Sequence, residues 1–445
     1  MKFNKITISL MTFSLLTLPT YAKNQDIGKF YGKLKIAQVI HGKHNGYDLT
    51  TGSAYYLNLG YRTKRINGFS FKISAYTVGD TGYTKTDKNE NVAKGMFMGK
   101  ATSNQDAIKS KQDIQDLFVD YKGYGYKAKI GHFELNTPMT KNATSTVPDL
   151  YEGLILSTNK FFNNTNITAG FLTRMAYGAR AISEWGKISE KKGNAGSIKV
   201  NSIDDEEPKI ASSSLISPSD MLPIRRGEFT NFGIISGADK KIDGLAIMGL
   251  INKSFKNTTI QAWDYYAKDV VNMFYVDFIK KVKLQKNLKT MLGGQVLTQK
   301  IEGLSGAPTL FGAKAGIKYN NIMLTLAYNK SNSKQIMNTW GGDPAYTSSK
   351  FSRNTYRPNV KAYKVIAKYK PTHKLLFIAT YAKYGKSSLA KTQKDATESD
   401  FAIKYKINKK LKLAISRVLR RSEFDGLKGK DKTQDYTSMS FVWKF

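Results

Sequence analysis

The connections between segments constrain the fold of this chain most, because short and long ones alternate. Turns such as 65–68 and 319–321 are short, whereas intervening connections such as 80–111 and 332–359 are long. A transmembrane β-barrel has this arrangement, with tight turns at one rim and extended loops at the other. A soluble β-sandwich gives no reason for loop length to alternate in this way. The pattern therefore predicts an all-β fold, a transmembrane antiparallel β-barrel.

The segments between these connections alternate at period two, as β-strands do. There are about eighteen of them, an even number, as bacterial single-chain barrels require. A further segment, 229–238, is left out because it would make the number odd. The predicted strands are 29–41, 54–65, 68–79, 112–122, 125–134, 150–159, 165–178, 244–253, 257–267, 271–282, 288–300, 309–319, 321–331, 360–370, 373–385, 399–408, 410–421 and 435–445.

The last ten residues show how one strand separates lipid from water. Their polar face is small or charged, and their apolar face carries Met439, Phe441, Trp443 and Phe445. This alternation suits a barrel wall. We expect this strand to pair with the first one, near 30–40, so that no open edge remains in lipid.

The N-terminus has the features of a secretory signal peptide over residues 1–22. Lys2 and Lys5 precede an apolar run, and Thr20-Tyr21-Ala22 forms a small-x-small cleavage site. No later stretch offers about 18 uninterrupted apolar residues for a membrane-spanning helix. The sequence therefore predicts an exported chain whose residues 23–445 form a single barrel domain in the bacterial outer membrane.

The formal net charge of +36 is unusually high. Such an excess often indicates nucleic acid, but in an exported barrel it is better explained by a basic pore or by anionic head groups. The expected partners are small solutes, outer-membrane lipid and lipopolysaccharide, and the barrel-assembly machinery, with the chain as a monomer or homotrimer. The chain has no cysteine, so a disulfide framework and thiolate metal sites are excluded.

Lysines fall repeatedly on the strand face opposite the aromatic residues. A lysine that faces lipid at mid-bilayer costs ~2–4 kcal/mol, so these side chains should face the lumen. Fixed cations in a narrow channel would bind and pass anions stepwise. The alternative is that many of them are turn-adjacent or head-group contacts. The predicted basic ladder consists of Arg174, Lys314, Lys318, Arg353, Arg357, Lys364, Lys368, Lys404, Lys406, Lys412 and Arg420.

Three acidic residues could face these cations where long connections fold into the pore. Asp149 and Glu152 lie at and after the connection 135–149, and Asp343 lies in 332–359. Acids and bases on opposite sides of a constriction would create a transverse field that orients zwitterions. The alternative is ordinary turn chemistry, because Gly-Asp-Pro is a common turn sequence.

These loops resemble a known family. The segment Pro148-Asp149-Leu150-Tyr151-Glu152-Gly153, preceded by 130–133, is similar to the third-loop region of the OprD-type substrate-specific porins, and 264–270, 340–343 and 351–369 resemble later landmarks. The resemblance implies eighteen strands, inward loops and a basic ladder for carboxylate-bearing substrates such as amino acids or small organic acids. Phe445 resembles the aromatic end by which many outer-membrane proteins are recognised for insertion.

Two departures from that family are present. The basic residue usual just before the third-loop Leu-Pro is absent from Thr146-Val147-Pro148. The connection 179–243 is unusually long and carries the acidic run 204–207.

The sequence thus predicts a passive diffusion porin without a cofactor or an enzymatic activity. Three other hypotheses remain: a sugar-type porin with a tyrosine stacking track, a non-conducting barrel adhesin, and a barrel hydrolase. His41, His44 and Asp48 have no spacing that defines a metal site. Phosphate-binding loops and dinucleotide motifs are absent from any strand-to-helix context.

Overall fold

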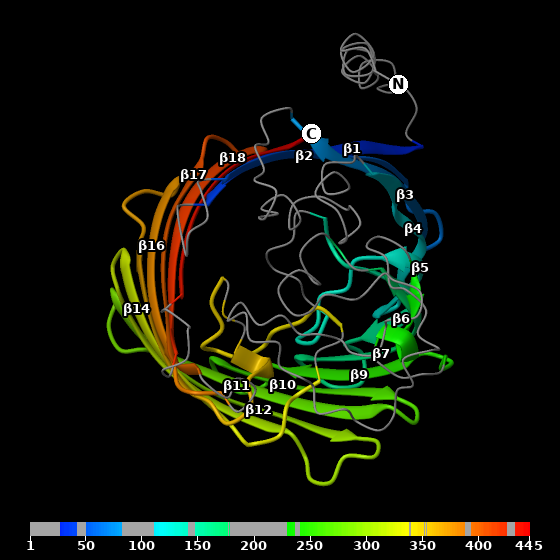
Figure 1. Ribbon diagram of the computed structural model, residues 1–445. Coiled ribbons are helices and arrows are strands. Elements are labelled where there is room, and N and C mark those ends of the chain that lie inside the picture. The colour runs from blue at the N-terminus through cyan, green and yellow to red at the C-terminus, as the bar shows by residue number, and fades with distance from the viewer. Residues whose placement is uncertain are drawn as a thin grey trace, which may run out of the picture.

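The structure is a computed structural model that describes residues 27–41, 50–81, 111–140, 147–176, 178, 229–235, 241–337, 340–350, 352, 354–387, 393–424 and 432–445. The predicted signal peptide, 1–22, and most of the connection 179–243 lie outside these residues. The described strands form one antiparallel sheet that closes into a ring (Figure 1). None of the helices in these ranges has the length and hydropathy needed to cross a membrane.

The ring contains eighteen of the nineteen strands, because β7 pairs directly with β9 and β8 is a two-residue addition to the end of β7. The strands are β1 Gly28–His41, β2 Thr50–Thr63, β3 Phe69–Asp80, β4 Lys111–Gly123, β5 Tyr126–Phe133, β6 Leu150–Thr158, β7 Thr165–Ala176, β8 Thr230–Asn231, β9 Leu245–Asn252, β10 Thr258–Ala267, β11 Val271–Lys283, β12 Leu288–Ile301, β13 Thr309–Tyr319, β14 Ile322–Ser331, β15 Lys361–Tyr369, β16 Leu375–Tyr384, β17 Gln393–Lys406, β18 Leu411–Phe424 and β19 Lys432–Lys444. The predicted fold class is confirmed.

Most predicted strand ends agree with these bounds within a few residues. The largest difference is β17, which begins at Gln393 rather than 399, because its first residues stay paired with β18 beyond the apolar part of the wall. The segment 229–238 is not a wall strand. Only Thr230–Asn231 pairs with β7, and a single helical turn, α2 Phe232–Ile235, follows.

The ring closes between β19 and β1. Their register places Trp443 opposite Leu34 and Phe441 opposite Ile36 on the outward face. The Phe445 amide donates to the Gly32 carbonyl at 3.0 Å, and the Gly32 amide donates back at 2.9 Å. The predicted pairing of the last strand with the first is confirmed.

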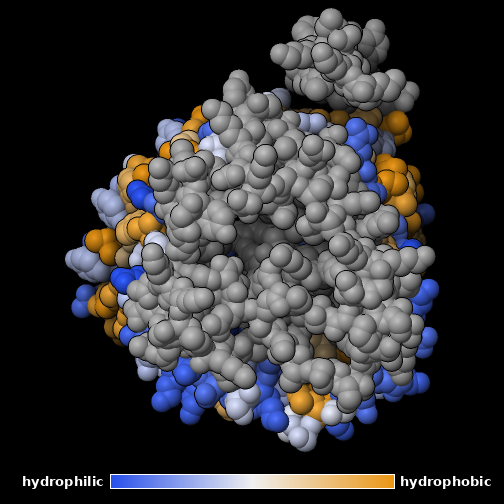
Figure 2. All heavy atoms as spheres, in the orientation of Figure 1, coloured by the Kyte–Doolittle hydropathy of each residue, from blue (hydrophilic) through white to orange (hydrophobic). Residues whose placement is uncertain are grey.

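The outer face of the wall is apolar and aromatic. In β15, Tyr363 and Val365 point outward and are 56% and 38% exposed, whereas Lys364 and Lys368 alternate with them on the inner face. Figure 2 shows hydrophobic side chains along the flank of the barrel. An exposed apolar band of this extent on a closed barrel is suited to lipid.

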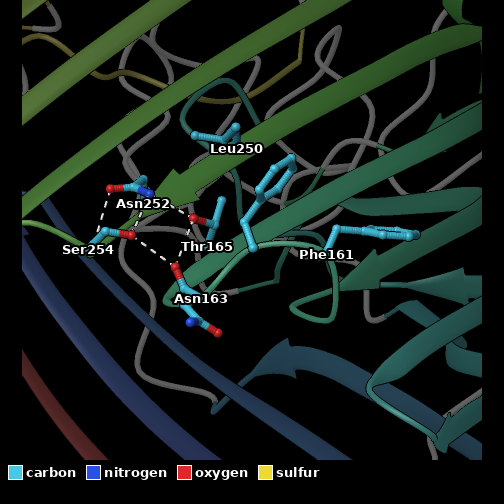
Figure 3. Close-up of a pocket in the computed structure, with 7 residues that line it drawn as sticks. Phe161, Asn163, Thr165, Leu250, Asn252 and Ser254 are labelled. Atoms are coloured by element: carbon cyan, nitrogen blue, oxygen red, sulfur yellow. Dashed lines mark hydrogen bonds between the residues drawn. The ribbon is translucent and has the colours of Figure 1, made fainter.

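One rim carries only short turns, namely 64–68, 124–125, 159–164, 253–257, 284–287, 320–321, 370–374 and 407–410. We call it the short-turn rim, and in bacterial barrels this end is periplasmic. Two of its turns are joined by a polar network around a shallow hollow (Figure 3). Asn252 donates to Thr165 Oγ1 at 2.6 Å, and Ser254 donates to the Asn163 carbonyl at 2.9 Å. The hollow lies at the rim, so it forms no part of a path through the lumen.

Two glycines lie opposite each other near the end of β5 and the start of β6. Gly131 in β5 has φ 125° and Gly153 in β6 has φ 153°, and the two are paired in register. A Cβ atom would lie 2.1 Å from the Leu117 carbonyl oxygen at the first position and 2.2 Å from the Phe171 carbonyl oxygen at the second. Just beyond this line the chain leaves β5 and runs inside the ring over 134–140 (Figure 1).

Gly131→Ala should therefore destabilise the barrel. The left-handed φ and the contact with Leu117 together should lower the free energy of unfolding by about 1–3 kcal/mol. Urea titration of the refolded protein, followed by heat-modifiable gel mobility, measures this change. Gly294→Ala is the matched control, because its nearest neighbours would lie 3.8 and 3.9 Å away. Equal stability of the two variants would contradict a backbone requirement at Gly131.

Candidate solute pathway

Two inward segments, 134–140 and 340–350, meet inside the barrel. The Tyr151 hydroxyl lies 2.6 Å from the Trp340 carbonyl oxygen and 2.9 Å from the Thr140 carbonyl oxygen. The Gly342 amide donates to the Met139 carbonyl at 2.9 Å. The Trp340 ring is fully buried, 5.8 Å from the ring of Tyr265 on β10. These contacts fill one side of the lumen and narrow the remaining space.

The second inward segment reaches the opposite part of the wall through Lys350. Its ammonium donates to Ser416 Oγ on β18 at 2.7 Å and to Ser438 Oγ on β19 at 3.0 Å. It also lies 4.6 Å from the centre of the Tyr436 ring. Lys350 was not among the predicted ladder residues, although Arg353 and Arg357 of the same connection were.

Two of the predicted constriction acids hold loops in shape. Asp343 accepts hydrogen bonds from Ser348 Oγ at 2.6 Å and from Thr355 Oγ1 at 2.5 Å. Asp149 is only 3% exposed and accepts from the Gly178 amide at 2.6 Å. These contacts tie Asp149 to the start of the next long connection and Asp343 to two hydroxyl groups of its own connection.

The third acid, Glu152, is bound to a predicted ladder residue. Arg174 lies opposite it in register, and Arg174 Nε donates to Glu152 Oε1 at 3.0 Å. His132 Nε2 is 2.7 Å from Glu152 Oε2. The structure thus brings Glu152 and Arg174 together, and their charges largely neutralise each other.

Other ladder residues support the base of the segment 340–350. Arg420 is 1% exposed and donates to Ser352 Oγ at 2.9 Å, while the Ser352 amide donates to Glu398 at 2.7 Å. The Arg357 guanidinium lies 5.3 Å from the Tyr384 ring centre and is buried. Arg353 lies outside the described residues. Arg420 and Arg357 are placed to hold the loop rather than to meet a solute.

Lys314 and Lys364 lie directly beneath the same segment. The Lys314 ammonium is 3.6 Å from the centre of the Tyr346 ring, and the Lys364 ammonium donates to the Ser348 carbonyl. The Tyr346 hydroxyl contacts Asp277, and burial raises the pKa of this phenol, so it remains a donor. Both lysines face inward as predicted, and both are partly covered by the loop.

The remaining predicted lysines lie on the inner face between this loop and the short-turn rim. Lys404 and Lys406 are exposed on β17, and Lys412 lies opposite Lys406 on β18. Lys318 and Lys368 belong to one continuous hydrogen-bonded row, which we call the lysine row. From β11 to β15 it consists of Lys283, Lys289, Lys318, Met323 and Lys368.

The same register continues from Lys368 through Ile378 and Ala402 to Ser416 and Ser438. It therefore ends at the two serines that bind Lys350. Strands of such barrels tilt by ~35–45° from the barrel axis. A row of residues paired across the strands therefore shifts in height from one strand to the next. Lys283 ends β11 at the short-turn rim, whereas Ser438 lies in the middle of β19. The row thus connects that rim with the narrow part of the lumen.

Sequence reasoning missed Lys283 and Lys289 at the start of this row. Both flank the turn 284–287, and their spacing from that turn would have placed them on one face once the hairpin register was known. The acids of the inner wall in β4 are occupied: Lys72 binds Asp116 at 2.8 Å, and Arg62 binds Asp120 at 2.8 Å. These two acids therefore do not neutralise the lysine row.

The comparisons with known proteins bear on the fold. No protein-family model matches the chain, and no curated protein matches it by sequence. The crystal structure of OccK9 (OpdG) from Pseudomonas aeruginosa is similar, with TM-score 0.70 and 11% identity over 94% of this chain and 99% of that one. OpdK from Pseudomonas aeruginosa with vanillate gives TM-score 0.68 and 10% identity over 94% and 98%. OccAB2 from Acinetobacter baumannii gives 0.68 and 13% over the same shares.

The chain therefore has the fold of these porins, and the resemblance drawn from the loop motifs is confirmed as a likeness of structure. One of the similar structures is named an outer membrane protein. A closed barrel with an apolar outer band agrees with the predicted location in the bacterial outer membrane.

Tyr151→Phe should loosen the junction of the two inward segments. Losing the hydroxyl leaves buried carbonyl groups unpaired, which costs about 1–3 kcal/mol. We expect normal insertion but a larger and noisier single-channel conductance in planar bilayers. Tyr319→Phe, at an exposed outward position, is the matched control. An unchanged conductance would show that this contact does not fix the constriction.

Proposed function

From the fold shared with the Occ and Opd porins, we propose that this chain is a passive outer-membrane porin that prefers small anionic solutes. The observation that carries this proposal is the lysine row, which leads from the short-turn rim to the serines beneath Lys350. Fixed cations spaced along a narrow path lower the energy of an anion at each step without binding it tightly. The similar solved structures are porins, which favours transport over catalysis.

The inward segments set the size limit in this mechanism. Their aromatic core around Trp340 and their hydrogen bonds to the wall keep the constriction in place without energy input. A solute passes Lys350, exchanges water for the hydroxyl groups of Ser416 and Ser438, and continues along Lys368 and Lys318. Each ammonium group binds the solute weakly enough that the next ammonium group along the row can compete for it.

Carboxylate-bearing solutes fit this scheme. OpdK, one of the similar structures, was solved with vanillate, an aromatic carboxylate. A sugar-type porin is less well supported, because inner tyrosines such as Tyr151, Tyr265 and Tyr384 are fully buried in loop and wall contacts. They present no open ring faces on which a sugar could stack.

Planar-bilayer recording in a salt gradient tests the proposal. Stepwise openings with a reversal potential on the anion side are expected, and the preference should weaken as salt screens the lysines. A cation preference would refute the basic pathway. A protein that inserts but never conducts would favour the adhesin hypothesis.

Charge reversal locates the path. Lys318→Glu combined with Lys368→Glu should lower the anion-to-cation permeability ratio by about fivefold or more, since about 1 kcal/mol corresponds to that factor. Lys253→Glu with Lys256→Glu is the matched control, because these residues lie in a turn at the same rim but outside the row. The proposal fails if both double variants have the same selectivity.

A further inference from the structure

Several lysines of the inner wall lie directly opposite another lysine on the neighbouring strand. Three such pairs in register are Lys283 with Lys289, Lys289 with Lys318, and Lys406 with Lys412. Directly opposed side chains of an antiparallel pair have Cβ atoms about 4.5–5.5 Å apart, and like charges at this distance repel. Repeated pairing of this kind indicates that negative charge from outside the barrel wall offsets the repulsion between the lysines.

The described carboxylates do not supply it. None of them forms an ion pair with any of these five lysines, whereas Asp116 and Asp120 on the inner wall bind Lys72, Arg62 and Arg65. The lysine pairs are exposed or half-exposed on the inner face and point toward the lumen. A mobile anion in the lumen is the remaining partner.

The grouping of the cations narrows the class of anion. Arginine presents a planar fork that fits a carboxylate or a phosphate, whereas the lysine ammonium is a compact point charge. Arginines described in the barrel are engaged elsewhere, as in the pairs of Arg174 with Glu152 and Arg417 with Asp435. The cations left facing the lumen at these pairs are lysines. Two ammonium groups at one place match two negative charges on one centre, which a monocarboxylate lacks.

We propose that the paired lysines bind the phosphoryl group of the solute, so that phosphate monoesters and inorganic phosphate are the preferred cargo. A phosphoryl group carries about −1.5 to −2 charges at pH 7 and has three acceptor oxygens, so both ammonium groups can contact it together. The phosphoryl group moves from Lys350 along the lysine row toward the short-turn rim. Lys289 belongs to two of the pairs, one with Lys318 and one with Lys283. This assignment rests on the proposed function of an anion-preferring porin.

Competition with chloride current tests the assignment. Inorganic phosphate, lactate and succinate are each titrated against the chloride conductance of the wild-type channel at pH 7.5. Phosphate should halve the current at roughly fivefold lower concentration than lactate, because one additional ammonium contact in a partly screened site contributes about that factor. Succinate, whose charges sit on two separate centres, should resemble lactate.

Lowering the pH provides a second readout. At pH 5 a phosphate monoester holds its second proton, since that pKa is about 6, and its advantage over lactate should shrink. A loss of advantage over this interval reports the charge on the solute.

The deciding variant is Lys289→Gln with Lys318→Gln, which should bring phosphate and lactate within about twofold of each other. The matched control is Lys330→Gln with Lys361→Gln, a directly opposed lysine pair on the outward face of β14 and β15, which should leave the difference unchanged. Heat-modifiable mobility confirms that both variants fold.

The outcomes separate the two proposals. If chloride current is anion-selective but phosphate and lactate compete equally, the phosphoryl assignment is wrong and the porin proposal stands. The assignment is also overturned if succinate matches phosphate, or if the outward control abolishes the difference. If the channel does not conduct or prefers cations, the proposed function itself fails.

Discussion

The structure depends on one constraint: in hydrocarbon, every backbone amide and carbonyl must find a partner within the protein. A sheet meets this condition only by closing on itself, and here the closure lies between β1 and β19, with mutual hydrogen bonds between Gly32 and Phe445 at the end. Closure fixes the direction of every side chain. Aromatic and aliphatic residues on one face meet lipid, and whatever alternates with them faces the lumen.

The same closure leaves a lumen that side chains alone do not fill. Two inward segments occupy one side of it, joined through Tyr151 and Trp340 and seated on an apolar core that includes Tyr265. Near the point where the first segment leaves the wall, Gly131 and Gly153 have a backbone conformation that a Cβ atom would obstruct. Part of the border of the remaining space consists of directly opposed lysines, such as Lys289 and Lys318, that form no ion pair with a described acid. An anionic solute that entered this space would therefore stabilise the wall as the wall stabilises the solute.

The basic ladder divides into two groups with different physical roles. Arg420 and Arg357 are buried beneath the loop and support it, and Arg174 is paired with Glu152. Lys318 and Lys368 lie on the open inner wall, in a row that also contains Lys283 and Lys289. A guanidinium can be buried because its five donors can be satisfied by protein groups, whereas an exposed ammonium keeps its charge available.

Period-two alternation and the spacing of turns were sufficient to predict the barrel, its strands, its closing pair and the inward direction of the lysines. These properties are local, because a strand's two faces follow from its own residues. The sequence could not show which inward cations are open to a solute. That depended on Ser348, Ser352 and Tyr346, residues of a distant loop that cover Lys364, Arg420 and Lys314. Nor could it reveal the lysine row, because a row joins residues of successive strands and exists only once the register is set. The tertiary structure alone decided both, since each depends on contacts between segments far apart in the chain.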